Sequence, residues 1–312
     1  MTPTIHWTEN DQACCARWQS ESNAPAPRRV IVADDTLNAD RAWHLACEGT
    51  AILWRGDFQN ARQLLQAMGR RTDRKPHKTG ATPLEAFNLH RQTQSQRART
   101  LGMLLIPVEP GHIIPLRRAP DLNQACEEAH GPAAEPYVCS LRELLGLVSA
   151  HEWRKKGVEI PVLQGRIHPH YGVFSPLRGE YLDLIAEAPL PDNSLAFDIG
   201  TGTGVIAALL ARRGVKKIVA TDQDPRALAC ATENLVRLDL AGRVSLEQVD
   251  LFPAGKAPLI VCNPPWLPAR PSSPVEYAVY DPESRMLFGF LNGLAAHLAP
   301  GGWLLVEHGA TQ

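Results

Sequence analysis

The fold is decided by the stretch Leu195-Ala-Phe-Asp-Ile-Gly-Thr-Gly-Thr-Gly204. Its apolar start predicts a buried strand, and its glycines predict a tight turn whose backbone amides can approach a ligand closely. A helix is expected next, from Val205 to Arg213, with its N-terminus directed at that ligand. Dinucleotide sites have the spacing G-x-G-x-x-G, which needs a glycine where Val205 stands. The observed D-x-G-x-G-x-G spacing leaves a nicotinamide oxidoreductase as a distant alternative.

The pattern after this stretch is regular, because apolar runs alternate with amphipathic segments. Strands joined by helices of about ten or more residues form βαβ units, which imply a parallel sheet with right-handed crossovers. We therefore expect an α/β domain built on a parallel sheet. Its expected strands are 195–199, 217–221, 244–249, 259–262 and 303–307, and its expected helices are 205–213, 225–238 and 285–298.

The first part of the chain mixes strands and helices less regularly, which predicts a separate mixed α/β domain. Residues 1–26 are polar and broken by proline and alanine, so we expect a helix and a loop there. An extended segment from Pro161 to Pro176 is expected to connect this domain to the parallel-sheet domain. The expected domains are residues 1–160, an accessory domain for substrate recognition, and residues 161–312, the catalytic domain. The first has expected strands at 30–33, 51–54 and 103–108 and helices at 38–47, 58–68, 83–99, 122–130 and 141–155.

The composition is that of an ordinary globular protein, with 44% hydrophobic and 21% charged residues and a net charge of −1. No window approaches the roughly 18 uninterrupted apolar residues of a membrane span, and the first residues lack the pattern of a signal peptide. Seven scattered cysteines without a C-x-x-C pair indicate neither a disulfide framework nor a zinc site. We therefore expect a cytoplasmic protein without membrane or metal binding.

Local charge is less even between Arg70 and Arg99, where eight basic residues stand against two acidic ones. Such a surplus can bind the phosphates of a nucleic acid. It is also typical of the solvated face of a helix and its loop. Both interpretations stay open.

Carboxylates follow the second and third strands, where a nucleoside ligand needs them. Asp222 ends the second strand about 20 residues after the glycines, and a carboxylate there accepts hydrogen bonds from both ribose hydroxyls. Asp250 ends the third strand and can accept from an adenine amino group, while the backbone amide of Leu251 faces the ring. Asp224 is expected to cap the helix that begins at Pro225.

The fourth strand ends in Asn263-Pro264-Pro265-Trp266. The nitrogen of an amide or a base amino group is a poor nucleophile, because its lone pair is delocalised. The Asn263 side-chain carbonyl and the Pro264 backbone carbonyl can accept both N–H groups and direct the lone pair at an electrophilic carbon. Trp266 offers a flat face for a planar substrate, and the prolines hold the backbone rigid before binding.

Together these residues resemble class I S-adenosylmethionine (AdoMet) dependent methyltransferases of the N-P-P-[YFW] type, which methylate planar NH2 groups. The resemblance covers roughly residues 165–312 and implies an enzyme with a Rossmann-like parallel sheet and AdoMet as cofactor. It also implies that the segment His170–Pro176 covers the methionine end of AdoMet. It assigns catalysis to Asn263, Pro264, Pro265 and Trp266, and AdoMet binding to Phe174, Asp198, Gly200, Thr201, Gly202, Gly204, Asp222, Asp250, Leu251 and Asn263.

The substrate implied by the resemblance is a macromolecule, with a slight preference for a protein glutamine side chain, as in the release-factor glutamine N5-methyltransferases. The segments 301–309 and 249–252 look most like that branch. The branch usually has tyrosine where Trp266 stands and a small helical bundle at its N-terminus. Nucleic-acid methyltransferases, acting on rRNA guanine N2 or adenine N6, therefore remain the alternative, through the Arg70–Arg99 stretch. A non-catalytic module that binds AdoMet or RNA is a remote alternative.

Class I sheets follow a seven-stranded pattern, whose last two strands would come after residue 307. Their apparent absence predicts a five-stranded core with the strand 303–307 as an open apolar edge. Either the chain is a fragment of a longer protein, or an N-terminal element or an oligomer partner covers this edge. The proline- and serine-rich loop Ala269–Tyr280 is a candidate substrate lid.

Overall fold

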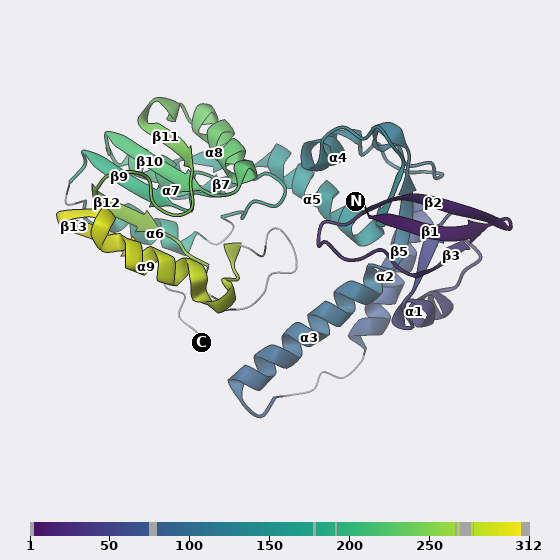
Figure 1. Cartoon of the computed structure of the whole chain (residues 1–312). Coiled ribbons are helices and arrows are strands. Elements are labelled where there is room, and N and C mark those ends of the chain that lie inside the picture. The colour runs from purple at the N-terminus through teal and green to yellow at the C-terminus, as the bar shows by residue number, and fades with distance from the viewer. Residues whose placement is uncertain are drawn as a thin grey trace. The chain divides into compact units, whose positions relative to one another are not determined.

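The computed structural model describes residues 3–74, 80–176, 179–190, 192–265, 267–268, 276 and 278–306. The chain divides into two compact units, Met1–Ser149 and Ala150–Gln312, and each contains its own main sheet (Figure 1). All site residues expected from the sequence belong to the second unit. No helix within the described ranges is long and apolar enough to cross a membrane.

The main sheet of the second unit has five parallel strands in the order β11-β10-β9-β12-β13. The chain forms β9, β10 and β11 in one direction and then returns to place β12 and β13 on the other side of β9. The carboxyl ends of β9 and β12 therefore lie where the strand order reverses, the usual ligand site of such sheets. The strands are β9 Leu195–Ile199, β10 Lys217–Asp222, β11 Val244–Gln248, β12 Ala257–Cys262 and β13 Leu298–Val306.

The described residues form five strands in this sheet, the number expected from the sequence. Strand β13 pairs with β12 and stands last in the order. Its side chains Trp303 and Val306 are exposed hydrophobics. Glu307, the expected last residue of this strand, lies outside the described residues.

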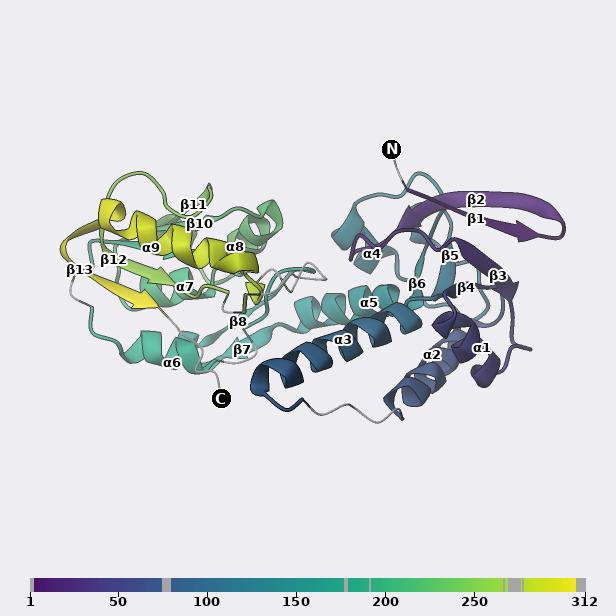
Figure 2. The same cartoon turned by 60° about the horizontal axis from the view of Figure 1, so that its bottom comes forward.

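Helices cover both faces of this sheet (Figure 2). On one face pack α6 Glu180–Glu187, α7 Val205–Arg212 and α8 Pro225–Arg237. On the other face, α9 Arg285–His297 buries Phe290 against Phe197 and Ile260. Helix α6 is not among the helices expected from the sequence, although Tyr181, Leu182 and Ile185 form a short apolar stripe.

The first unit is a mixed α/β domain, as the sequence predicts. Its sheet has the order β1-β2-β6-β5-β4-β3, in which β3, β4 and β5 run parallel and β6 runs antiparallel to β5. The strands are β1 Thr4–Glu9, β2 Gln12–Gln19, β3 Arg29–Ala33, β4 Thr50–Trp54, β5 Leu104–Val108 and β6 Tyr137–Ser140. The helices are α1 Ala39–Cys47, α2 Phe58–Asp73, α3 Pro83–Leu101, α4 Asn123–His130 and α5 Leu141–Lys156, the last of which continues past Ser149 into the second unit.

The helix expected within residues 1–26 is wrong, because the antiparallel hairpin β1–β2 stands there, whereas the expected loop follows the hairpin from residue 20. Asn10 and Asp11 form its turn, and both have positive φ angles (51° and 59°). Two left-handed residues between paired strands are the geometry of a tight hairpin turn, for which Asn and Asp are favoured. Only Ile5 and Trp18 of the hairpin are buried. The alternation of apolar and polar residues that indicates a strand is therefore weak in its sequence.

The prediction of an extended connecting segment from Pro161 to Pro176 is also partly wrong. A small antiparallel sheet stands there, formed by β7 Val158–Ile160 and β8 Gly165–Ile167 and closed by a 3-10 turn at Pro161–Leu163. Val158, Ile160 and Ile167 are buried in the same core as α7. After β8 the chain has no regular secondary structure until α6 in the described residues.

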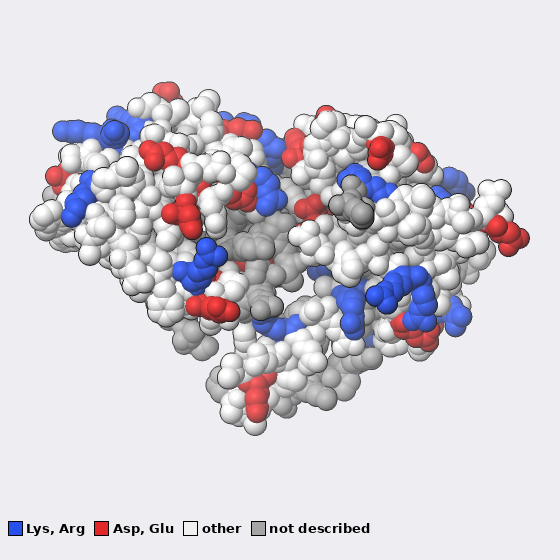
Figure 3. Space-filling model, viewed as in Figure 1, with Lys and Arg blue, Asp and Glu red and all other residues white. Residues whose placement is uncertain are grey.

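The basic stretch Arg70–Arg99 is partly neutralised within its own unit. Arg71 forms an ion pair with Asp40 (2.6 Å), and Arg97 forms one with Asp73 (2.8 Å). On the visible face of the molecule, basic and acidic side chains are interspersed (Figure 3). Two of the eight basic residues, Lys75 and Lys78, lie outside the described residues.

Candidate active site

A cavity of about 640 Å³ opens at the carboxyl ends of β9, β10 and β12. This volume is within the range of about 300–1,000 Å³ that is typical of small-molecule and cofactor sites. The cavity brings together residues separated by up to 117 positions in the chain, from Gly172 to Gly289. Of the residues predicted from the sequence, the lining includes Phe174, Gly200, Thr201, Gly202, Asp222, Asp250, Leu251, Asn263 and Pro265.

The glycine turn forms one wall of this cavity and is fixed by backbone hydrogen bonds. The amides of Gly200 and Thr201 both donate to the carbonyl of Thr221 (2.9 and 2.8 Å). Gly204 is the N-cap of α7 and has φ of 79°, and a Cβ there would lie 3.1 Å from the Cα of Ala231 in α8. Glycine is needed at this position because the backbone is left-handed and α8 packs directly against it.

Asp198 lies beneath the turn and does not line the cavity. Its Oδ2 accepts hydrogen bonds from Thr201 Oγ1 (2.6 Å) and from the backbone amide of Ala207 (3.1 Å). Complete burial raises the pKa of this carboxyl to about 7, against the lowering effect of these hydrogen bonds. In this arrangement Asp198 braces the turn against α7, and its expected direct contact with AdoMet stays a prediction. Gly204 likewise does not line the cavity.

Asp222 lines the cavity with its carboxylate held by two backbone amides. Gly202 donates to Oδ2 (3.0 Å) and Asp224 donates to Oδ1 (2.9 Å). Burial raises the pKa of Asp222, and the two amides act against this rise. Each oxygen keeps further acceptor capacity for a ligand hydroxyl. Asp224 is the N-cap of α8, as expected, because its side chain accepts from the amide of Arg226 (2.9 Å).

The backbone is strained where Asp250 and Leu251 reach the cavity. Leu251 has φ of 70°, a left-handed conformation that is uncommon for a side chain of its size. Thr221 Oγ1 holds this conformation by donating to the Leu251 carbonyl (2.6 Å). A Cβ at Gly289 of α9 would lie 2.9 Å from Leu251 Cδ1, so a glycine there leaves room for the loop. Such strain is often found at ligand sites, and the adenine contacts expected of Asp250 and Leu251 stay a prediction.

Asn263 and Pro265 line the cavity at the end of β12, and Pro264 is buried between them. The Asn263 side-chain oxygen Oδ1 is buried, and no described group donates a hydrogen bond to it. A buried acceptor without a partner costs about 1–3 kcal/mol. Trp266 and most of the loop expected to be a lid, Ala269–Tyr280, lie outside the described residues.

Several lining residues were not predicted from the sequence. Tyr181 comes from the unpredicted helix α6, and Arg285, Met286 and Gly289 come from α9. Asp281 also lines the cavity and accepts hydrogen bonds from the amides of the first turn of α9. An aspartate followed by proline shortly before an apolar helix is a recognisable start signal and could have found Asp281.

The chain is similar to known methyltransferases. A family model described as the methyltransferase small domain matches residues 165–306. The release factor glutamine methyltransferase of Cereibacter sphaeroides is 38% identical over 149 residues, which are 43% of this chain and 54% of that protein. The ribosomal protein L11 methyltransferase of Pelotomaculum thermopropionicum is 30% identical over 176 residues, which are 55% of this chain and 56% of that protein.

Among solved structures, a SAM-dependent methyltransferase from Geobacter sulfurreducens in complex with S-adenosyl-L-homocysteine is 21% identical to this chain. The match covers 43% of this chain and 48% of that one, with a TM-score of 0.32. The chain thus spans about half the length of the curated relatives that it matches. Residues 165–306 thus match the methyltransferase small domain, and the chain is similar to release factor glutamine methyltransferases.

Proposed function

We propose that this chain is an AdoMet-dependent N-methyltransferase that acts on the side-chain amide of a protein glutamine. The observation that carries this proposal is the side-chain oxygen of Asn263. It is a buried acceptor without a described donor, and its residue forms part of the wall of a cavity of cofactor size. An incoming amide N–H would supply the missing hydrogen bond.

The residues around the cavity fit AdoMet. Asp222 has free acceptor capacity for the ribose hydroxyls, and Asp250 and Leu251 stand where the adenine is expected. The glycine turn and Phe174 would hold the methionine part. When bound, AdoMet supplies a methyl group on a positively charged sulfur, which is a strong electrophile.

The catalytic contribution of the chain is to position the acceptor nitrogen. Asn263 would accept one N–H of the carboxamide and the Pro264 carbonyl the other, which draws electron density toward the nitrogen. AdoMet would supply the methyl group, and the nitrogen held by these two acceptors would release one proton to solvent after the transfer. Because the rigid proline pair fixes the acceptors in advance, little reorganisation is needed during transfer.

We propose a protein substrate rather than a nucleic acid for two reasons. The curated relatives named above carry the names of protein methyltransferases. In addition, two arginines of the basic stretch are engaged in ion pairs with aspartates of their own unit. Residues 1–160 would select the substrate, because the methyltransferase domain itself supplies the cofactor site. A cytoplasmic location is part of the proposal and agrees with seven free cysteines.

The test is transfer of a labelled methyl group from AdoMet into a cell extract, followed by separate counting of protein and RNA. We expect the label in protein, and acid hydrolysis of that protein should release it as volatile methylamine, the product of an N-methyl amide. Label confined to RNA would instead establish the nucleic-acid alternative. No incorporation into either fraction, with AdoMet bound, would favour a non-catalytic binding module.

A further inference from the structure

The segment between β8 and α6 forms one side of the cavity without regular secondary structure. Gly172, Val173 and Phe174 line the cavity from this segment. A segment of this kind lacks a ladder of backbone hydrogen bonds, so its position depends on side chains of neighbouring elements. We call residues 168–174 the covering segment.

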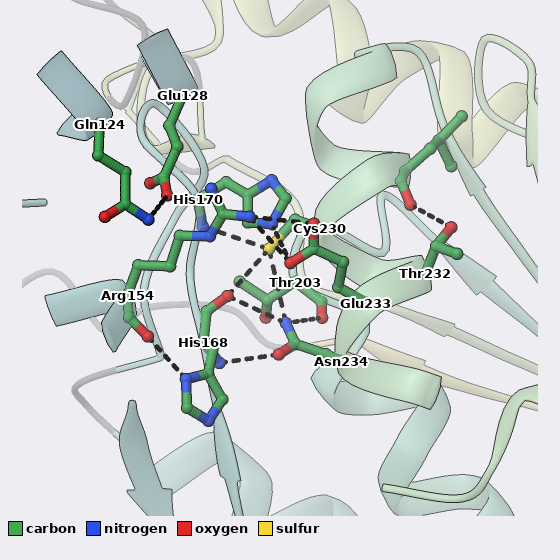
Figure 4. Close-up of polar contacts among 11 residues, drawn as sticks. Gln124, Glu128, Arg154, His168, His170, Thr203, Cys230, Thr232, Glu233 and Asn234 are labelled. Atoms are coloured by element: carbon green, nitrogen blue, oxygen red, sulfur yellow. Dashed lines mark hydrogen bonds and ion pairs between the residues drawn. The ribbon is translucent and has the colours of Figure 1, made fainter. Parts of the chain in front are cut away.

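Asn234 of α8 connects the covering segment to the glycine turn (Figure 4). Its Oδ1 accepts from the amide of His168 (2.8 Å), and its Nδ2 donates to the carbonyl of Thr203 (3.0 Å). The side chain is completely buried. One residue that does not line the cavity therefore joins two of its walls.

Glu233, the neighbour of Asn234, holds the same segment through His170. Its Oε2 lies 3.0 Å from His170 Nε2, and both of its oxygens accept from Arg154 (3.0 and 2.9 Å). Partial burial opposes ionisation, but the hydrogen bonds from His170 and Arg154 prevail and lower the pKa of Glu233. The glutamate is therefore a charged acceptor, and charge-assisted hydrogen bonds are stronger than neutral ones.

These contacts come from one stripe of α8. Ala227, Cys230, Glu233 and Asn234 are spaced by three and four residues, which places them on one face of a helix. Val173 packs against Ala227 and Cys230 in a small cluster of its own. The apolar end of the stripe thus supports the lining residue, and the polar end fixes the start of the covering segment.

We propose that Glu233 and Asn234 are positioning residues that set the affinity for AdoMet by holding the covering segment over the cavity. This inference rests on the proposed function and deepens it, because it assigns cofactor affinity to residues outside the cavity wall. Glu233 acts through His170, and Asn234 acts through the backbone of the covering segment and the glycine turn.

The test is a double-mutant cycle with Glu233→Ala and His170→Ala in the full chain, read by calorimetric titration with AdoMet. Each single variant should raise the Kd about tenfold, the equivalent of about 1.4 kcal/mol. The double variant should be no worse than either single variant, since both remove the same interaction. At saturating AdoMet the kcat should stay within about twofold of the wild type, and Glu233→Gln, which keeps an acceptor oxygen, should recover part of the affinity.

Arg237→Gln is the matched control, because it removes a charge from an exposed position one turn further along the same helix. It should leave the Kd unchanged. Because Asn234→Ala can prevent folding, the Glu233 cycle decides the proposal. Wild-type affinity in Glu233→Ala, additive losses in the double variant, or a fall in kcat with unchanged Kd would each overturn it. Failure of the wild type to bind AdoMet would refute the proposed function itself.

Discussion

The buried carboxyl of Asp198 makes the stability of the second unit depend on pH in a definite direction. Its folded-state pKa of about 7 lies above the ordinary value of 3.8, because burial disfavours the charged form. The folded chain therefore binds a proton that the unfolded chain has already lost. Stability from this group is fully present below pH 3.8 and is lost as the pH rises toward 7.

The magnitude follows from the size of the shift. One pH unit corresponds to about 1.36 kcal/mol, so a rise from 3.8 to about 7 is equivalent to about 4 kcal/mol. Between pH 5.5 and pH 8 the loss is about 2 kcal/mol. With an unfolding slope of about 2 kcal/mol per molar urea, the wild-type midpoint should fall by roughly 1 M for this reason.

The decisive variant is Asp198→Asn, which keeps an acceptor oxygen for Thr201 and Ala207 but cannot ionise. Urea unfolding at pH 5.5 and pH 8 should show a smaller fall in midpoint for this variant than for the wild type, by roughly 1 M. Asp239→Asn, at an exposed position, serves as the control and should follow the wild type. An identical pH dependence in wild type and Asp198→Asn would refute the argument that burial holds this carboxyl neutral.

Three further variants test the site. Asn263→Ala should lower kcat by about 10²–10³-fold while AdoMet binding is retained, and near-normal turnover would exclude its role as amide acceptor. Asp222→Asn should weaken AdoMet binding by about 10–100-fold in calorimetry, because hydrogen bonds to a charged acceptor contribute about 1.5–3 kcal/mol. An unchanged affinity would exclude the predicted contact between Asp222 and the ribose. Gly204→Ala should lower the free energy of unfolding by about 2–5 kcal/mol through left-handed strain and the contact with Ala231. Gly214→Ala, with φ of 92° and open space around it, should show the strain alone, and an equal loss in both would contradict the packing argument.

The parallel sheet could be predicted from the sequence because its signals are local. Apolar runs alternate with amphipathic helices, and the observed strands β9 to β12 agree with the expected ones within two residues at each end. The helix start at Asp224 was also predictable, since a cap depends only on residues within one turn. The hairpin β1–β2 was missed because its strands bury few side chains, although Asn10-Asp11 is a turn signal.

The site was only partly predictable. The polar residues at strand ends could be assigned to the cavity because parallel strands bring their carboxyl ends to one edge of the sheet. The sequence could not separate Asp198, which braces the turn from below, from Asp222, which faces the cavity. Both are aspartates at the end of a strand, and only their burial and partners distinguish them.

The sequence alone determined the parallel sheet and its glycine turn, and it predicts a nucleoside site and an N-P-P-W acceptor there, because spacing and residue type act over a few positions. Only the tertiary structure decided which side chains of the surrounding helices hold the segments around the cavity in place. Asn234 meets Thr203 and His168 across 31 and 66 positions of the chain, and Gly289 makes room for Leu251. Contacts over such separations depend on how helices pack on the sheet, and no local pattern encodes them.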